Sequence, residues 1–269
     1  MSETKEYYKF VPVRSTFRRL QEFDSRLKYE NVFVVKPKFR AKTDLHVSSG
    51  KKKLLKVWGK FEILLQHYKN SEGTPVIPGS SLKGAVSTNF LALSDDSTLT
   101  ANLFGTTREK AVISKLFFSD LIPEGEVKLK KVEVLRQWSP QRIMKNKNRY
   151  VKFYTGRAPK TERYGLMECI PAGTVLGGKI CGYNLRELEL GGLLISMGYG
   201  IQNAVFKIGY AKPQGFGQLQ LIDVGLSEIE FDGMSFVERK REPKEFAEKF
   251  SQEYRKRIKE YADIIFRGI

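Results

Sequence analysis

The order of the strands and helices predicted along the chain is the feature that most limits how it can fold. Residues 33–47 hold two short runs of β-branched and aromatic residues, which predict a strand or a bent pair of strands. After a lysine-rich segment expected to be a loop, Ser80 or Ser81 is a good N-cap for a helix whose apolar residues recur every three or four positions. The remaining pattern predicts strands over residues 115–122, 126–138, 164–170 and 174–182, a helix over 185–197, and a strand that contains residues 219–222.

This order is β, α, β, β, α, β with insertions, and it predicts the α+β class. It is typical of the ferredoxin-like plan, in which an antiparallel sheet carries two helices on one face. We predict a single domain over residues 1–269, with a basic loop or hairpin inserted at residues 139–163 and a C-terminal amphipathic helix at residues 243–266. The polar face of that helix mixes both charges, which favours packing on its own domain over docking on a neighbouring subunit.

Positive charge is concentrated in two segments of the chain. The chain has 47 Lys and Arg against 30 Asp and Glu, a net charge of +17. Residues 36–60 hold nine of these bases and one acid, and residues 128–165 hold twelve bases and two acids. Aromatic residues such as Trp58, Phe61 and Tyr154 lie among them. Such clusters suit phosphate neutralisation together with base stacking, so nucleic acid is the first candidate partner.

The remaining composition disfavours several other classes of protein. The only cysteines are Cys169 and Cys181, and the only histidines are His46 and His67. These residues lack the close spacing of a zinc site, so neither a disulfide framework nor a metal ion or cofactor is expected. No run of 18 apolar residues and no signal peptide is present, which predicts a cytoplasmic protein with no membrane partner.

Two glycine-containing segments are candidates for contact with an anion. In residues 75–84, PVIPGSSLKG, a prolyl turn leads into the first turn of the predicted helix, where free backbone N–H groups favour phosphate. In residues 209–217, GYAKPQGFG, glycines allow a ligand to approach the backbone closely. Each segment alone is equally well explained as a helix cap or a tight turn.

Four further motifs stand in order with these two segments. They are LHVSSG at residues 45–50, NLFG at 102–105, LFFSD at 116–120 and ECIPAGT at 168–174. The whole series resembles the RAMP superfamily of CRISPR-associated proteins. Within it, the series is most similar to the backbone-type subunits of type III (Csm or Cmr) effector complexes.

The resemblance implies an RRM-like fold that binds a guide RNA (crRNA) and target RNA beside other RAMP subunits. Residues 139–163 fit the basic thumb of such subunits by position and charge. The residues expected to contact RNA are His46, Ser48, Ser49, Lys51, Lys52, Lys53, Ser80, Ser81, Lys83, Arg142, Lys145, Lys147, Arg149, Lys212, Gln214, Gly215, Phe216 and Gly217.

The chain departs from target-cleaving relatives at one position. Those relatives carry an aspartate, needed for metal-dependent RNA cutting, in the loop that corresponds here to residues 47–74. That stretch has no aspartate; it contains Glu62 and Glu72, and Asp44 precedes it on the predicted strand. We therefore expect a non-cleaving subunit with no catalytic residue.

Three alternatives remain open. The first is metal-dependent target cleavage through Asp44 or Glu62. The second is guide processing with His46 as general acid or base, although a histidine at a strand end is more often structural. The third is a free-standing nucleic-acid binder.

Asp120 is expected to cap the turn that leads to Pro123.

Overall fold

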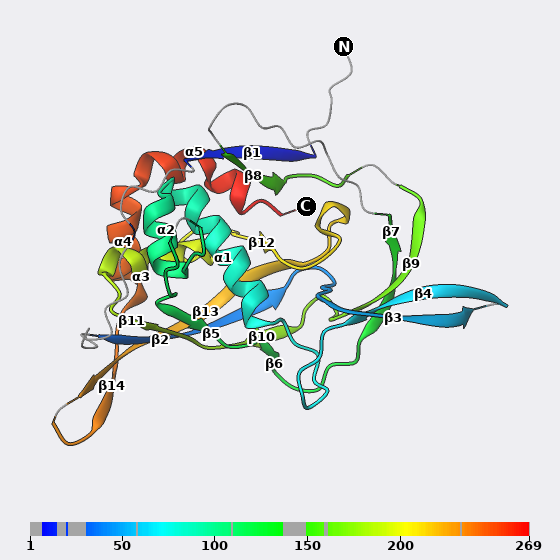
Figure 1. Ribbon diagram of the computed structural model, residues 1–269, viewed down its shortest axis with the longest axis horizontal. Helices are drawn as coiled ribbons and strands as arrows, with labels where there is room; N and C mark the ends of the chain where they lie inside the picture. Colours follow the sequence, from blue (N-terminus) through cyan, green and yellow to red (C-terminus); the bar gives the residue numbers. More distant parts are fainter. Residues whose placement is uncertain are drawn as a thin grey trace, which may run out of the picture.

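The computed structural model describes residues 7–14, 20, 31–57, 59–108, 110–136, 149–158, 161–231 and 233–268. Within these residues the chain forms five α-helices, one short 3-10 helix and three β-sheets (Figure 1). The predicted α+β class is confirmed. No helix in this part of the chain is long and apolar enough to span a membrane.

The central sheet is built around β2 (Val32–Ala41), whose alternate side chains enter the core. Phe33, Val35, Phe39 and Ala41 are buried there, while Lys36, Lys38 and Arg40 point to the opposite face. β2 pairs antiparallel with β13 on one side and with β10 and β11 on the other. The other strands of this sheet are β5 (Leu116–Phe118), β6 (Ile122–Pro123), β10 (Val175–Gly177), β11 (Ile180–Tyr183), β12 (Phe206–Lys207), β13 (Gln218–Phe231) and β14 (Phe236–Lys240).

The helices pack over one face of this sheet, with α1 (Gly79–Ser94) and α3 (Glu187–Ser196) in contact (Figure 1). α2 (Ser97–Phe104) and α4 (Pro243–Glu253) complete this layer. The single helix predicted over residues 243–266 is in fact two, because Tyr254 leaves the helical conformation at φ −105° and ψ 22° before α5 (Arg255–Ile265). The bend allows Phe250 of α4 and Ile265 of α5 to enter the same core.

A second sheet has the order β3 (Ser48–Val57), β4 (Lys60–His67), β9 (Arg163–Cys169), β7 (Lys130–Leu135). The lysine-rich segment predicted as a loop is therefore strand β3. Its side chains are mostly exposed, so pairing with β4, and not burial, keeps it extended.

A third sheet pairs β1 (Tyr8–Val13) with β8 (Arg149–Tyr154). Strand β8 lies within the predicted insertion, so this part of residues 139–163 is held against the molecule. Val11 and Phe153, on neighbouring strands, both pack on the main core. Residues 137–148 and 159–160 lie outside the described residues, as do Trp58 and the predicted contacts Arg142, Lys145 and Lys147.

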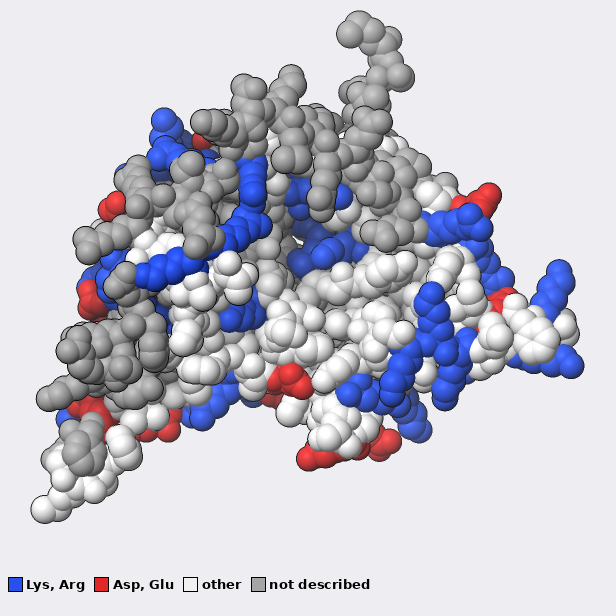
Figure 2. Space-filling model, in the orientation of Figure 1, with Lys and Arg blue, Asp and Glu red and all other residues white. Residues whose placement is uncertain are grey.

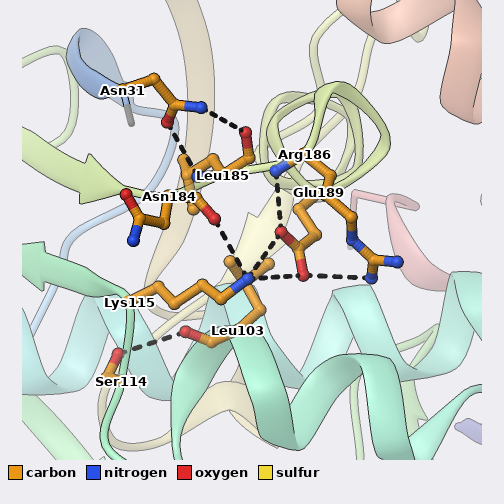
Figure 3. A network of polar contacts seen from close by, with 8 residues as sticks. All are labelled: Asn31, Leu103, Ser114, Lys115, Asn184, Leu185, Arg186 and Glu189. Atoms are coloured by element: carbon orange, nitrogen blue, oxygen red, sulfur yellow. Dashed lines mark hydrogen bonds and ion pairs between the residues drawn. The ribbon is translucent and has the colours of Figure 1, made fainter. Parts of the chain in front are cut away.

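A buried ion pair fixes the start of α3 against the loop that precedes β5 (Figure 3). The Lys115 ammonium donates to both carboxylate oxygens of Glu189, at 3.1 and 3.2 Å, and to the carbonyl oxygen of Asn184 at 3.1 Å. Glu189 has no exposed side-chain surface, and it also accepts from the backbone N–H of Arg186 at 2.9 Å. All charges of the pair are therefore hydrogen-bonded, as burial requires.

We expect Lys115→Met to lower the free energy of unfolding by up to about 3–5 kcal/mol, because it leaves the buried carboxylate of Glu189 with only the exposed guanidinium of Arg186, 3.2 Å away, as a counter-charge. The matched control is Lys38→Met, which breaks a half-exposed pair with Glu124 and is expected to cost far less, because solvent screens the pair. Urea denaturation of both variants measures the difference. Equal losses would show that the buried pair contributes no more than a surface pair.

Candidate nucleic-acid interface

A groove of about 540 Å³ lies between α1, β8 and the segment that begins at β12. Figure 2 shows a hollow in this area, with Lys and Arg side chains visible inside it. The groove brings together parts of the PVIPGSSLKG segment, the basic insertion and the glycine-rich segment. Its lining residues are Ser81, Gly84, Ala85, Thr88, Asn89, Lys152, Phe153, Tyr154, Lys207, Ile208, Gly209, Lys212 and Ile265.

Three lysines converge on this groove, and no Asp or Glu is among its described lining residues. Burial lowers the pKa of Lys212, and the nearby charge of Lys152 lowers it further. Burial also lowers the pKa of Lys207 to about 8, with a smaller contribution from Arg267. Desolvated, mutually repelling cations gain most from an anionic partner, so the groove suits phosphate groups.

The start of α1 differs from the prediction. Pro78, and not Ser80 or Ser81, is the N-cap, and the N–H of Gly79 donates to the Asp120 carboxylate at 2.9 Å. A Cβ at Gly79 would lie 2.2 Å from the carbonyl oxygen of Phe118, so only glycine fits beside β5. Asp120 therefore caps α1 and not the Pro123 turn, and its negative charge lies where phosphate was expected to bind.

Only part of this first motif reaches the groove. Ser81 lines it, one position along from Ser80, which is exposed outside the lining. Lys83 is half-buried and also lies outside the lining, and burial lowers its pKa. The motif therefore contributes the Ser81 hydroxyl to the groove, while the Lys83 ammonium that was predicted to bind RNA lies outside the lining.

The glycine-rich segment is a tight loop that includes the 3-10 helix η1 (Lys212–Gln214). Gly209 and Gly217 have φ of +81° and +75°, and a Cβ on either would lie within 2.2 Å of a backbone carbonyl oxygen. Lys212 faces the groove, but the Gln214 amide exchanges two 3.1 Å hydrogen bonds with the backbone of Leu135.

Other residues of this loop also contact the protein itself. Phe216 packs against the small core of the second sheet, and Gly215, at φ +91°, lies beside Arg157. Of the residues predicted to contact RNA in this loop, Lys212 is the one whose side chain lines the groove.

Comparison with known families supports the motif analysis. The model of the RAMP superfamily matches residues 38–268. The chain belongs to the RAMP superfamily. No curated protein matches it. Membership supports a CRISPR-associated, RNA-binding role, and such proteins typically act with RNA in multi-subunit complexes.

His46 of this RAMP protein is buried, so its side chain is not placed to contact RNA at the surface. Its Nδ1 lies 2.6 Å from the carbonyl oxygen of Glu168, and its ring packs edge-on against His67 with centroids 5.7 Å apart. Burial lowers the pKa of both rings, that of His67 to about 4 with a further contribution from His46. The pair is a neutral structural element beneath the glycine-rich loop.

The remaining predicted contacts lie outside the groove lining. Ser48 and Ser49 are at the base of the β3–β4 hairpin, where Ser49 donates to the carbonyl oxygen of Gln66 at 3.0 Å. Lys51, Lys52 and Lys53 follow on β3, and Arg149 is an exposed residue that begins β8.

The two basic segments meet in the second sheet, where the Lys52 ammonium donates to the Tyr164 hydroxyl at 3.0 Å. Lys36 and Lys38 are separate from this contact, on the open face of the central sheet, and pair with Glu238 and Glu124. The first basic segment is thus divided between two surfaces, and none of its described residues lines the groove.

The two carboxylates considered for catalysis are both engaged in other contacts. Asp44 lies after the end of β2, not on the strand, and accepts from Lys130 at 2.9 Å and from the backbone N–H of Ala172 at 3.0 Å. Glu62 accepts from Arg163 at 2.8 Å. Both acids hold neighbouring chain segments together.

Sequence reasoning did not select Lys152, Lys207 or Thr88, although all three line the groove. Lys152 stands between aromatic residues in a basic segment, and Lys207 is two residues before the glycine-rich loop. The sequence context of both lysines could therefore have marked them as candidate RNA contacts. No such pattern marks Thr88, because an exposed threonine in a helix is ordinary.

We expect acid to destabilise this protein partly through His67. Because its pKa is about 4 in the folded state against 6.5 ordinarily, the unfolded chain binds more protons between these values. The contribution of His67 to the free energy of unfolding is therefore fully present above pH 6.5. It falls by up to roughly 3 kcal/mol as the pH approaches 4. Chemical denaturation of His67→Gln should show a shallower pH dependence over this range than the unchanged protein, and an identical slope would contradict the assignment.

We also expect RNA affinity to fall as the pH rises through about 8, because Lys207 then loses its charge. Lys207→Arg keeps a cation at this position at every pH tested, since a guanidinium does not titrate in this range. Its affinity should therefore change less between pH 7 and pH 9. Fluorescence anisotropy with single-stranded RNA measures this, and an equal decline in both proteins would exclude Lys207 as the titrating contact.

Proposed function

We propose that this RAMP protein is a guide RNA-binding subunit of a type III CRISPR interference complex that does not itself cut RNA. The observation that carries the proposal is the convergence of Lys152, Lys207 and Lys212 in one groove with the hydroxyl residues Ser81 and Thr88. Lysines and hydroxyls bind phosphate oxygens without reading bases, which suits a subunit that must accept any guide sequence.

The order of the strands supports an RRM-like, ferredoxin-like arrangement. Across the central sheet the strands run β13, β2, then β10 and β11, then β5 and β6, and all of these pairs are antiparallel. α1 follows β2 in the chain and α3 follows β11, so one helix stands in each β-α-β half. This arrangement agrees with the resemblance to backbone-type subunits, whose partners are guide RNA, target RNA and other RAMP subunits.

The contacts of Asp44 and Glu62 support a non-cleaving role. Metal-dependent cutting would require a carboxylate that is free to bind a cation at the scissile phosphate. Asp44 instead joins Lys130 to the turn at Ala172, and Glu62 is paired with Arg163. Guide processing through His46 would similarly require the buried ring to reach RNA.

We expect the double variant Lys152→Ala/Lys212→Ala to weaken binding of single-stranded RNA at low salt. Removing two phosphate contacts should make the slope of log Kd against log salt shallower by about 1.4, since each contact to a single strand contributes about 0.7. A filter-binding series across salt concentrations measures both quantities.

The matched control is Lys36→Ala/Lys38→Ala, which removes the same charge from the open face of the central sheet. It should leave the slope nearly unchanged. Equal effects of the two double variants would show that net charge, and not the groove, governs binding, and a salt-independent affinity of the unchanged protein would contradict the proposal as a whole.

A further inference from the structure

The hairpin of β3 and β4 projects from the body of the molecule and exposes two large apolar side chains (Figure 1). Leu54 is 70% exposed and Phe61 is 72% exposed. Leu54 is paired with Ile63 and Lys56 with Phe61, so all four side chains lie on one face of the hairpin. Exposing a phenyl ring and an isobutyl group as diagonal neighbours on one face is unfavourable unless something covers them.

The same hairpin is strongly basic. Lys51, Lys52, Lys53, Lys56 and Lys60 lie on it with one acid, Glu62, which faces the other way and pairs with Arg163. Within the described chain these five lysines form no ion pair with an acid. Figure 2 shows Lys and Arg side chains gathered over this part of the molecule. The repulsion among them favours a polyanionic partner.

We infer that this face of the hairpin is a second nucleic-acid contact, in which a nucleobase of a single strand stacks on Phe61 while Lys52 and Lys56 neutralise the adjacent phosphates. An exposed ring between lysines matches the alternation of base and phosphate along a single strand. A protein partner would have to supply several carboxylates and an apolar surface together, so nucleic acid is the simpler complement.

The glycine-rich loop relates this face to the groove. Ile63 packs on the small core of the second sheet, and so do Tyr210 and Phe216 of the loop. Lys212 of the same loop lines the groove. One loop therefore borders both surfaces. The inference rests on the proposed function, because it adds a contact for the nucleic acid that the groove is proposed to bind.

The experiment compares single-stranded RNA with inorganic polyphosphate. Both probes are polyanions, but only RNA carries bases. Phe61→Ala should weaken binding of single-stranded RNA by roughly 5- to 100-fold, the effect of losing one stacked base, and leave binding of inorganic polyphosphate unchanged. Phe61→Trp should keep RNA affinity within about 3-fold, because an indole ring also stacks. Lys52→Ala/Lys56→Ala should weaken binding of both probes.

Phe236→Ala on the β13–β14 hairpin is the matched control, since that ring is also exposed (78%) but lies on another hairpin. It should leave RNA affinity unchanged. Melting temperatures of all variants verify folding, and none should shift much because the altered side chains are exposed.

Two outcomes would overturn the inference. Equal loss of RNA and polyphosphate binding in Phe61→Ala would show that the ring does not stack on bases. Unchanged RNA affinity in this variant would show that no base stacks on Phe61, and reduced self-association in size-exclusion chromatography would then make the hairpin a protein contact. In either case, weaker RNA binding by Lys152→Ala/Lys212→Ala would still support the proposed function. If neither this double variant nor Phe61→Ala bound RNA more weakly, both the inference and the proposed function would be wrong.

Discussion

Two backbone hydrogen bonds between the glycine-rich loop and the segment after β2 position Lys212 for the groove and Phe216 for the second sheet. The N–H of Tyr210 donates to the His46 carbonyl at 2.9 Å, and the N–H of Gly217 donates to the Asp44 carbonyl at 3.0 Å. No side chain fits at Gly209 or Gly217 in this arrangement. These bonds hold Lys212 at the groove on one side of the loop, while Phe216 packs against the second sheet on the other. A displacement of the loop would therefore alter both surfaces together.

Two kinds of wholly or partly buried charge occur in the described part of the molecule, and they differ in how each is compensated. Lys115 and Glu189 neutralise each other within the core, so their contribution is structural. The groove lysines have no such acid beside them, and burial lowers the pKa of Lys207 and Lys212. Without a ligand, the protein thus keeps partly desolvated positive charge in the groove, which is unfavourable in free energy. An anionic ligand would offset this, as is typical of a binding site.

The helix α1 and the antiparallel strands around β2 could be predicted because their signals are local. Apolar spacing marks the buried face of α1, and alternation marks β2. Strand β3 was mistaken for a loop because lysine has little strand preference, and its extended form depends on hydrogen bonds to β4. The break at Tyr254 carries no glycine or proline, and it reflects how α4 and α5 reach a shared core.

The chemistry of the ligand can be recognised from composition and motif order, because charge clustering and glycine-rich turns are properties of short segments. Which residues share a surface depends on long-range contacts that no short segment encodes. Asp120 caps a helix 41 residues earlier in the chain, and Gln214 is bound to Leu135, 79 residues before it. Ser81, Lys152 and Lys207 become neighbours only when β8 and the β12 segment fold against α1, since burial of apolar faces, and not the order of charges, brings them together.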